Sequence, residues 1–239
     1  MSHYSDVGFK LSANDADAIK EIEAIIRYFL SFKYDKFEAW QIGDYDYLMF
    51  LVGDIRYFII RNKNCNIINK HSLGYNNKII TEVDTISNIP MLNETEDFDL
   101  IKVEKNGIPF WFSCPNIDII GKNNLINKIK IACFADNAII KEQNVSKLDI
   151  EQYGMFADQC YIANMESLDR GFISAIIKDF KIEKNILTNS NYIVVDAECL
   201  GMNLKMLIED HPQIVKELKI GRVICGEFWN TALIVGKYF

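Results

Sequence analysis

The pattern of apolar and polar positions changes along the chain, and the first clear pattern is helical. Apolar side chains recur every three or four positions at Ile19, Ile22, Ile26 and Phe29. This is the period of an amphipathic helix. We therefore expect one N-terminal helix at residues 14–31, with its apolar stripe packed across a sheet.

From Lys36 to Arg61 the period is two, which is typical of half-buried strands. The runs FEAWQI, YLMFLV and IRYFII are separated by a turn at Gly43-Asp44 with Tyr45-Asp46 and by a two-residue turn at Gly53-Asp54. A further pair of alternating runs is joined by Asn106-Gly107. This dipeptide favours a type I′ turn, so it predicts a hairpin.

The last third of the chain, residues 172–239, holds more strand-like runs and one short helical segment. The strands are expected at 172–183, 192–199, 203–208, 221–225 and 228–235. Pro212 begins the helix expected at 212–218, because proline suits the first turn. Five strands with a helix after the third indicate a small β-barrel, either OB-like or SH3-like.

The expected fold is α+β and β-dominated, an antiparallel sheet with one N-terminal helix followed by a C-terminal small β-barrel. Two lobes are expected, residues 1–120 and residues 121–239, and the second ends in the barrel at 172–239. The boundary is placed by the asparagine-rich stretch at 116–125, which also contains Gly121.

Composition and charge exclude several classes of protein. Of 239 residues, 49% are hydrophobic and 25% charged, which is ordinary for a globular chain. The net charge of −7 argues against binding to nucleic-acid phosphates, which requires a basic face. No apolar run is long enough for a membrane helix, and the N-terminus lacks an apolar signal core. A soluble, cytoplasmic protein is expected.

No local motif for catalysis, cofactor binding or metal binding is present. The six cysteines are never closer than 19 residues, so no C-x-x-C pair exists, and reduced, buried thiols are expected. The P-loop, the dinucleotide fingerprint, the zinc-protease motif and the hydrolase elbow are absent. His3, His71 and His211 have no partner at a ligand spacing. No catalytic, cofactor-binding or metal-binding residue is therefore predicted.

Aromatic side chains on strands are the candidate binding residues. The candidates for contact with a partner or ligand are Trp40, Tyr45, Tyr47, Trp111, Phe228 and Trp229. Trp111 lies between Phe110 and Phe112, so alternation puts aromatic surface on both sides of its strand. An exposed aromatic surface marks a binding site. The alternative is that the helix covers one face and the second lobe covers the other.

Two short stretches resemble a bacterial cytoplasmic protein family whose members begin SHxSxxGF. The opening residues 2–9 read SHYSDVGF, and the closing stretch contains Asn185, Thr188, Leu200-Gly201, Gly221 and GEFW at 226–229. The family has a small residue where Glu227 stands. The family has no assigned reaction, so the resemblance implies two lobes with a terminal β-barrel and assigns no functional residue.

The leading hypothesis is a non-enzymatic binding protein that acts through protein–protein contact. An acidic surface suits a basic partner, as in an immunity-like protein that neutralises a toxin. One alternative is a small-molecule or carbohydrate-binding protein with its ligand between the lobes. The other is a hydrolase-type enzyme without a local motif, using carboxylates with His71 or His211.

Overall fold

The computed structural model describes the chain at residues 7–8, 24, 27, 37–64, 68–76, 78–89, 100–117, 127–142 and 158–235. Within these ranges the protein is almost entirely β, with two sheets and one short helix. The predicted α+β class is therefore wrong. The helix expected at 14–31 lies outside the described residues except at Ala24 and Arg27.

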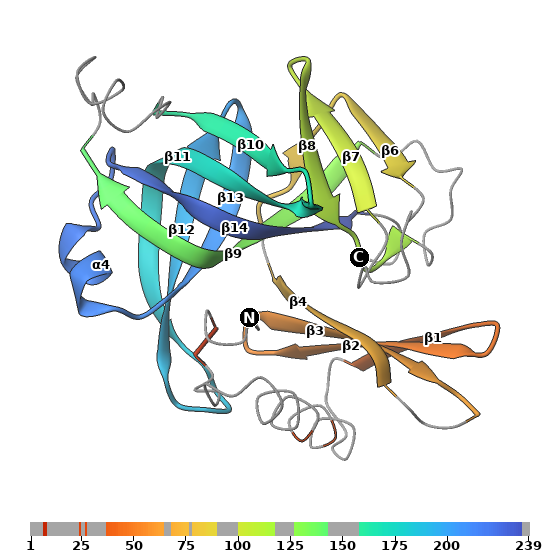
Figure 1. The fold of residues 1–239 in the computed structure, drawn as a ribbon. Coiled ribbons are helices and arrows are strands. Elements are labelled where there is room, and N and C mark those ends of the chain that lie inside the picture. Colours follow the sequence, from red (N-terminus) through yellow and green to blue (C-terminus); the bar gives the residue numbers. More distant parts are fainter. Residues whose placement is uncertain are drawn as a thin grey trace.

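The smaller sheet has four antiparallel strands in chain order (Figure 1). They are β1 (Phe37–Ile42), β2 (Tyr45–Val52), β3 (Ile55–Asn62) and β4 (Ile68–Tyr75). The runs with period two thus form strands, as their alternation predicts. Both two-residue turns begin with a glycine at positive φ, 58° at Gly43 and 61° at Gly53, which suits a type II′ hairpin turn.

The larger sheet has ten strands, and its order crosses the chain sequence several times. Its first strands are β5 (Thr81–Glu82), β6 (Thr85–Ile89), β7 (Leu100–Lys105), β8 (Ile108–Ser113) and β9 (Lys128–Lys141). Its later strands are β10 (Cys160–Asn164), β11 (Ser167–Lys184), β12 (Asn191–Cys199), β13 (Met202–Glu209) and β14 (Val223–Ile234). The hairpin between β7 and β8 turns at Asn106 and Gly107, both at positive φ, and confirms the type I′ prediction.

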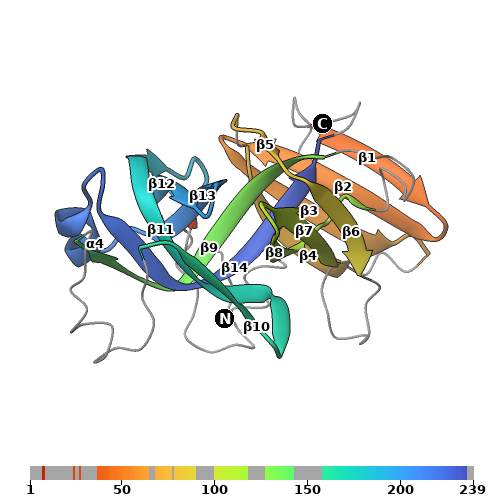
Figure 2. The same cartoon turned by 90° about the horizontal axis from the view of Figure 1, so that it is seen from above.

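Five strands of the larger sheet follow one another in a closed series of pairings, because β11 pairs with both β12 and β14. We call the series β11, β12, β13, β9 and β14 the ring (Figure 2). The prediction of a self-contained small barrel at 172–239 is wrong. β14 pairs along its whole length with β9, which comes from residues 128–141. The ring also continues through β8 into β7 and β6.

The reason lies in the burial of these strands on both faces. Successive side chains of β12 point alternately into the ring, as Ile193 and Val195 do, and out of it, as Tyr192 and Val194 do. All four of these side chains are at most 2% exposed. The inner face joins the core of the large sheet, and the outer face is covered by the small sheet. A strand of this kind needs partners on both faces, so residues 172–239 do not bury their apolar surface alone.

The short helix α4 (Pro212–Glu217) joins β13 to β14. Pro212 stands in its first turn, as predicted. The Nδ1 atom of His211 accepts a hydrogen bond from the backbone N–H of Gln213 at 3.3 Å, so this histidine caps the helix. The division into lobes of residues 1–120 and 121–239 stays a prediction.

The turn between β11 and β12 holds the chain near its beginning. The side-chain amide of Asn185 donates to the carbonyl of Val7 at 2.6 Å, and the hydroxyl of Thr188 donates to the carbonyl of Gly8 at 2.7 Å. Val7 is fully buried between the small sheet and the ring. Gly8 has φ +84°, and a Cβ there would lie 3.0 Å from the carbonyl oxygen of Ser190. Only glycine meets both conditions without strain.

Candidate functional site

The hairpin of β1 and β2 carries a cluster of apolar side chains on one face. Trp40 pairs directly with Tyr47, and Ile42 pairs with Tyr45. Paired residues lie on the same face of a sheet, as do residues two apart along a strand. Ile60 of β3 pairs with Tyr47 and continues this face. We call Trp40, Ile42, Tyr45, Tyr47 and Ile60 the aromatic patch.

On the face of the small sheet that carries the aromatic patch, Met49 and Phe58 are buried with Leu233 of β14, and Trp40 packs against this cluster. The opposite face carries Leu48, Phe50 and Ile59, which are buried against the ring. At the turn end of the hairpin the patch is open to solvent: Ile42 is 37% exposed and Tyr45 is 39% exposed. Its remaining members are half-buried. Figure 1 shows that this end of β1 and β2 extends beyond the ring.

A hollow of about 10 Å³ adjoins the patch, which is room for about one water molecule. The described residues that line it are Trp40, Tyr47, Leu48, Phe58, Ile59, Ile60 and Pro115. Pockets for small organic ligands usually occupy about 300 Å³ or more. The hollow is therefore too small for such a ligand.

The hairpin itself carries only negative charges, while Arg56 of the neighbouring strand β3 lies close enough to Glu38 to interact with it. Residues 37–52, which form the hairpin, contain Glu38, Asp44 and Asp46 and no lysine or arginine. Asp46 is paired with Arg61 of β3, at 3.0 Å between Nε and the carboxylate. Glu38 and Asp44 are exposed. An apolar surface bordered by carboxylates favours a partner with basic and apolar side chains.

Both faces of β1 are exposed along much of the strand. Glu38 and Ile42 on the patch face and Ala39 and Gln41 on the other face are all exposed. In the part of the chain that the structure describes, β1 pairs with β2 and with no other strand. β1 is therefore an accessible edge strand.

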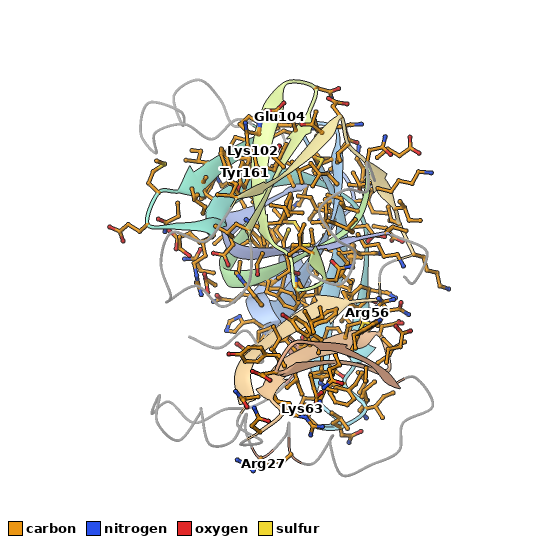
Figure 3. The ribbon with its side chains drawn as sticks, turned by 90° about the vertical axis from the view of Figure 1, so that its right-hand side faces the viewer. Arg27, Arg56, Lys63, Lys102, Glu104 and Tyr161 are labelled. Atoms are coloured by element: carbon orange, nitrogen blue, oxygen red, sulfur yellow. The ribbon has the colours of Figure 1, made fainter. Side chains whose placement is uncertain are left out.

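The other predicted aromatic residues are not brought to this patch. Trp111 stacks on Tyr161 with ring centroids 6.3 Å apart, and its backbone N–H donates to the Tyr161 hydroxyl at 3.2 Å. Phe228 is fully buried within the ring. The indole N–H of Trp229 donates to Asp169 at 2.8 Å. Figure 3 shows Tyr161 with Lys102 and Glu104 away from the small sheet, where Arg56 and Lys63 lie.

The six predicted binding residues thus divide into two groups. Trp40, Tyr45 and Tyr47 form one surface together with Ile42 and Ile60, which sequence reasoning did not select. Ile42 could have been found from the sequence, because Ile42 and Tyr45 flank the two-residue turn and therefore pair directly. Trp111, Phe228 and Trp229 do not share one surface, and their role in binding stays a prediction.

A cluster of titratable side chains joins the small sheet to the ring. The hydroxyl of Tyr75 in β4 donates to Glu183 in β11 at 2.9 Å, and the hydroxyl of Tyr192 in β12 donates to the other oxygen of that carboxylate at 2.6 Å. The ammonium of Lys181 also binds Glu183. Burial alone would raise the pKa of Glu183, but hydrogen bonds from Lys181, Tyr192 and Tyr75 together hold it below its usual value. Sequence reasoning missed this cluster because its members come from three strands.

The described cysteines are free thiols, and most of them are buried. Cys114, Cys133, Cys160, Cys199 and Cys225 are free. Burial raises the pKa of Cys133 above the usual range and that of Cys199 to about 12, so these groups are thiols rather than nucleophilic thiolates. Among the described residues, no three His, Cys, Asp or Glu side chains gather as a metal site would require. The side chain of His71 is outside the described set.

Comparisons of the chain with protein-family models, curated proteins and solved structures find no match. None of the helices in the described ranges is long and apolar enough to span a membrane.

Proposed function

We propose that this protein binds another protein through the aromatic patch and the acidic edge beside it. The observation that carries the proposal is the exposed end of the β1–β2 hairpin, where Ile42 and Tyr45 are 37% and 39% exposed on a surface continuous with Trp40, Tyr47 and Ile60. Contiguous apolar surface of this kind, with aromatic side chains at its centre, is typical of protein interfaces.

The negative charge of the hairpin favours a partner with a basic docking surface. The hairpin contributes three carboxylates and no basic side chain, and the chain as a whole has a net charge of −7. A partner with a basic docking surface gains from this charge both in the rate of encounter and in selectivity. The more specific role expected from the sequence, a cytoplasmic immunity protein that neutralises a basic toxin, needs the same surface and stays a proposal.

A small-molecule function receives less support. The hollow beside the patch measures about 10 Å³. It is smaller than ligand pockets generally are.

The test is capture of a partner by the tagged full-length protein from a lysate of the organism that produces it, followed by mass spectrometry and titration with the purified partner. Ile42→Lys and Tyr45→Lys place a cation within the patch. Ile220→Lys makes the same change of charge at a side chain that is 67% exposed, just after α4 at the other end of the molecule (Figure 1).

A basic protein should be bound by the wild type and by Ile220→Lys, and should bind Ile42→Lys and Tyr45→Lys at least about tenfold more weakly, because a buried cation replaces apolar contact. Equal binding by all four proteins would show that the patch is not the interface. A native mass that reveals a bound small molecule, with no captured protein, would refute the proposal itself.

A further inference from the structure

The edge of β1 offers a row of backbone groups for hydrogen bonding. Ile42 and Tyr45 close a two-residue turn and are therefore a hydrogen-bonded pair, and hydrogen-bonded pairs alternate with non-hydrogen-bonded pairs along an antiparallel ladder. The backbone N–H and C=O groups of Phe37, Ala39 and Gln41 consequently point away from β2. Ala39 and Gln41 are also exposed.

Apart from the charge of Glu38, β1 lacks the features by which natural edge strands avoid pairing with other chains. Such strands usually carry lysine or proline, are very short, or contain a bulge. The run FEAWQI has neither lysine nor proline, and its six residues pair with β2 without a shift of register. An unprotected edge beside an exposed apolar face is a template for a further strand.

The edges of the larger sheet are protected in the usual way. β10 has a register shift between Ala163 and Asn164, where it pairs with β11. β6 is five residues long, exposes Thr85 and Ser87, and is followed in the sequence by Pro90. Among the described strands, β1 is thus an edge with less protection than β6 and β10.

We propose that an extended, basic segment of the partner protein adds to β1 as a further strand of the small sheet. This inference rests on the proposed function and names its mode of recognition. The backbone of the segment pairs with Phe37, Ala39 and Gln41, and its apolar side chains on one face extend the aromatic patch from Trp40 and Ile42. Its basic side chains alternate with these and lie on the other face of the sheet, the face of Ala39, Gln41 and Asp46.

Charge argues against a second copy of this chain as the occupant. Pairing of two β1 strands would bring two hairpins together that each carry three carboxylates and no basic residue. Like charges placed opposite each other destabilise a pair of strands.

The test uses the full-length protein and a synthetic seven-residue peptide, Lys-Val-Lys-Ile-Lys-Val-Lys, with blocked ends. Two N-methylated forms have the same composition: one is methylated at Lys residues only, the other at Val and Ile only. In either register one form loses the N–H groups that face β1, and the other keeps them. A peptide with Glu in place of Lys is the charge control. Amide hydrogen exchange is measured at Ala39 and Gln41, and affinity by titration at low and high salt.

The unmethylated peptide should bind and slow exchange at Ala39 and Gln41 by at least about tenfold, as a new ladder of hydrogen bonds requires. One methylated form should bind at least about tenfold more weakly than the other. The Glu peptide should not bind, and high salt should weaken the Lys peptide. Absence of binding, equal binding of both methylated forms, or binding without slower exchange at Ala39 and Gln41 would overturn strand addition, as would dimerisation of the free protein through β1.

These outcomes are separate from those of the proposed function. If Ile42→Lys still abolishes capture of a protein partner while the peptide fails, the patch is the interface and the mode of binding is wrong. If the partner binds Ile42→Lys normally, the proposed function fails first.

Discussion

The carboxylate of Glu183 joins the small sheet to the ring, and its removal should weaken this junction. It accepts hydrogen bonds from Tyr75 and Tyr192 and pairs with Lys181. The two tyrosines are 3% and 2% exposed, and the Glu183 side chain is 16% exposed. Water therefore cannot readily replace the carboxylate as an acceptor.

The cost follows from the groups left without partners. A buried donor that loses its acceptor costs about 1–3 kcal/mol, so with two such hydroxyls we expect Glu183→Ala to lower the free energy of unfolding by about 3 kcal/mol. Glu183→Gln keeps one oxygen acceptor and should lose about half of this amount, or about 1.5 kcal/mol. Tyr75→Phe should cost less in the Glu183→Ala background than in the wild type, because its hydroxyl then has no acceptor to lose.

The stabilisation contributed by Glu183 should fall as the pH is lowered. The pKa of Glu183 is lowered in the folded protein. Its stabilisation is therefore fully present above the unfolded-state pKa, about 4.3, and is lost as the pH falls through the folded-state pKa. Urea unfolding of the wild type and the Glu183 variants should show the full difference at pH 7 and a smaller one at about pH 3. A loss below about 0.5 kcal/mol for Glu183→Ala at pH 7, or a difference independent of pH, would refute this reasoning.

Three further predictions concern the backbone and the thiols. Gly8→Ala should lower the free energy of unfolding by about 1 kcal/mol more than Gly43→Ala does. Both glycines have positive φ, but only at Gly8 would a Cβ meet a close neighbour. Urea unfolding of the two variants measures the difference. Gly226→Ala should prevent folding or cost more than about 3 kcal/mol, because its Cβ would lie 2.0 Å from the carbonyl oxygen of Asn137; a native circular dichroism spectrum with normal stability contradicts this. In a Cys65→Ser variant the remaining thiols should react slowly with a disulfide reagent at pH 8, because they are wholly or partly buried, and rapid labelling in the native state would be the contrary result.

Local features of the fold could be predicted from the sequence where a few adjacent residues decide the structure. Asn106-Gly107 forms the expected type I′ turn because both residues tolerate positive φ. Pro212 begins α4 because its fixed φ suits a first helical turn. Gly226 lies next to the register shift between Glu227 and Phe228, and glycine within a strand often marks such a bulge.

The arrangement of the sheets could not be predicted in this way. Strand alternation identifies β9 and β14 as strands but does not state that they pair with each other, since that contact spans about ninety positions in the chain. Nor does it show that Tyr192 faces the small sheet while Ile193 faces the interior of the ring. A strand that is apolar on both faces reads the same in a small barrel and in a covered sheet.

The candidate site shows the same limit. Trp40, Tyr45 and Tyr47 could be selected as aromatic residues on strands, and the turn brings them together. Trp111, Phe228 and Trp229 satisfied the same criterion, yet each lies against a different neighbour in the fold. Exposure decides between these two groups, and exposure depends on the packing of the sheets.

Binding through the β1–β2 hairpin can be tested by amide hydrogen exchange over the whole chain, with and without the captured partner. Exchange should be slower in the bound protein at residues 37–47, with the other described strands unchanged. Slower exchange elsewhere, for instance at the β10–β11 hairpin with its exposed Met165, and none at residues 37–47, would contradict it.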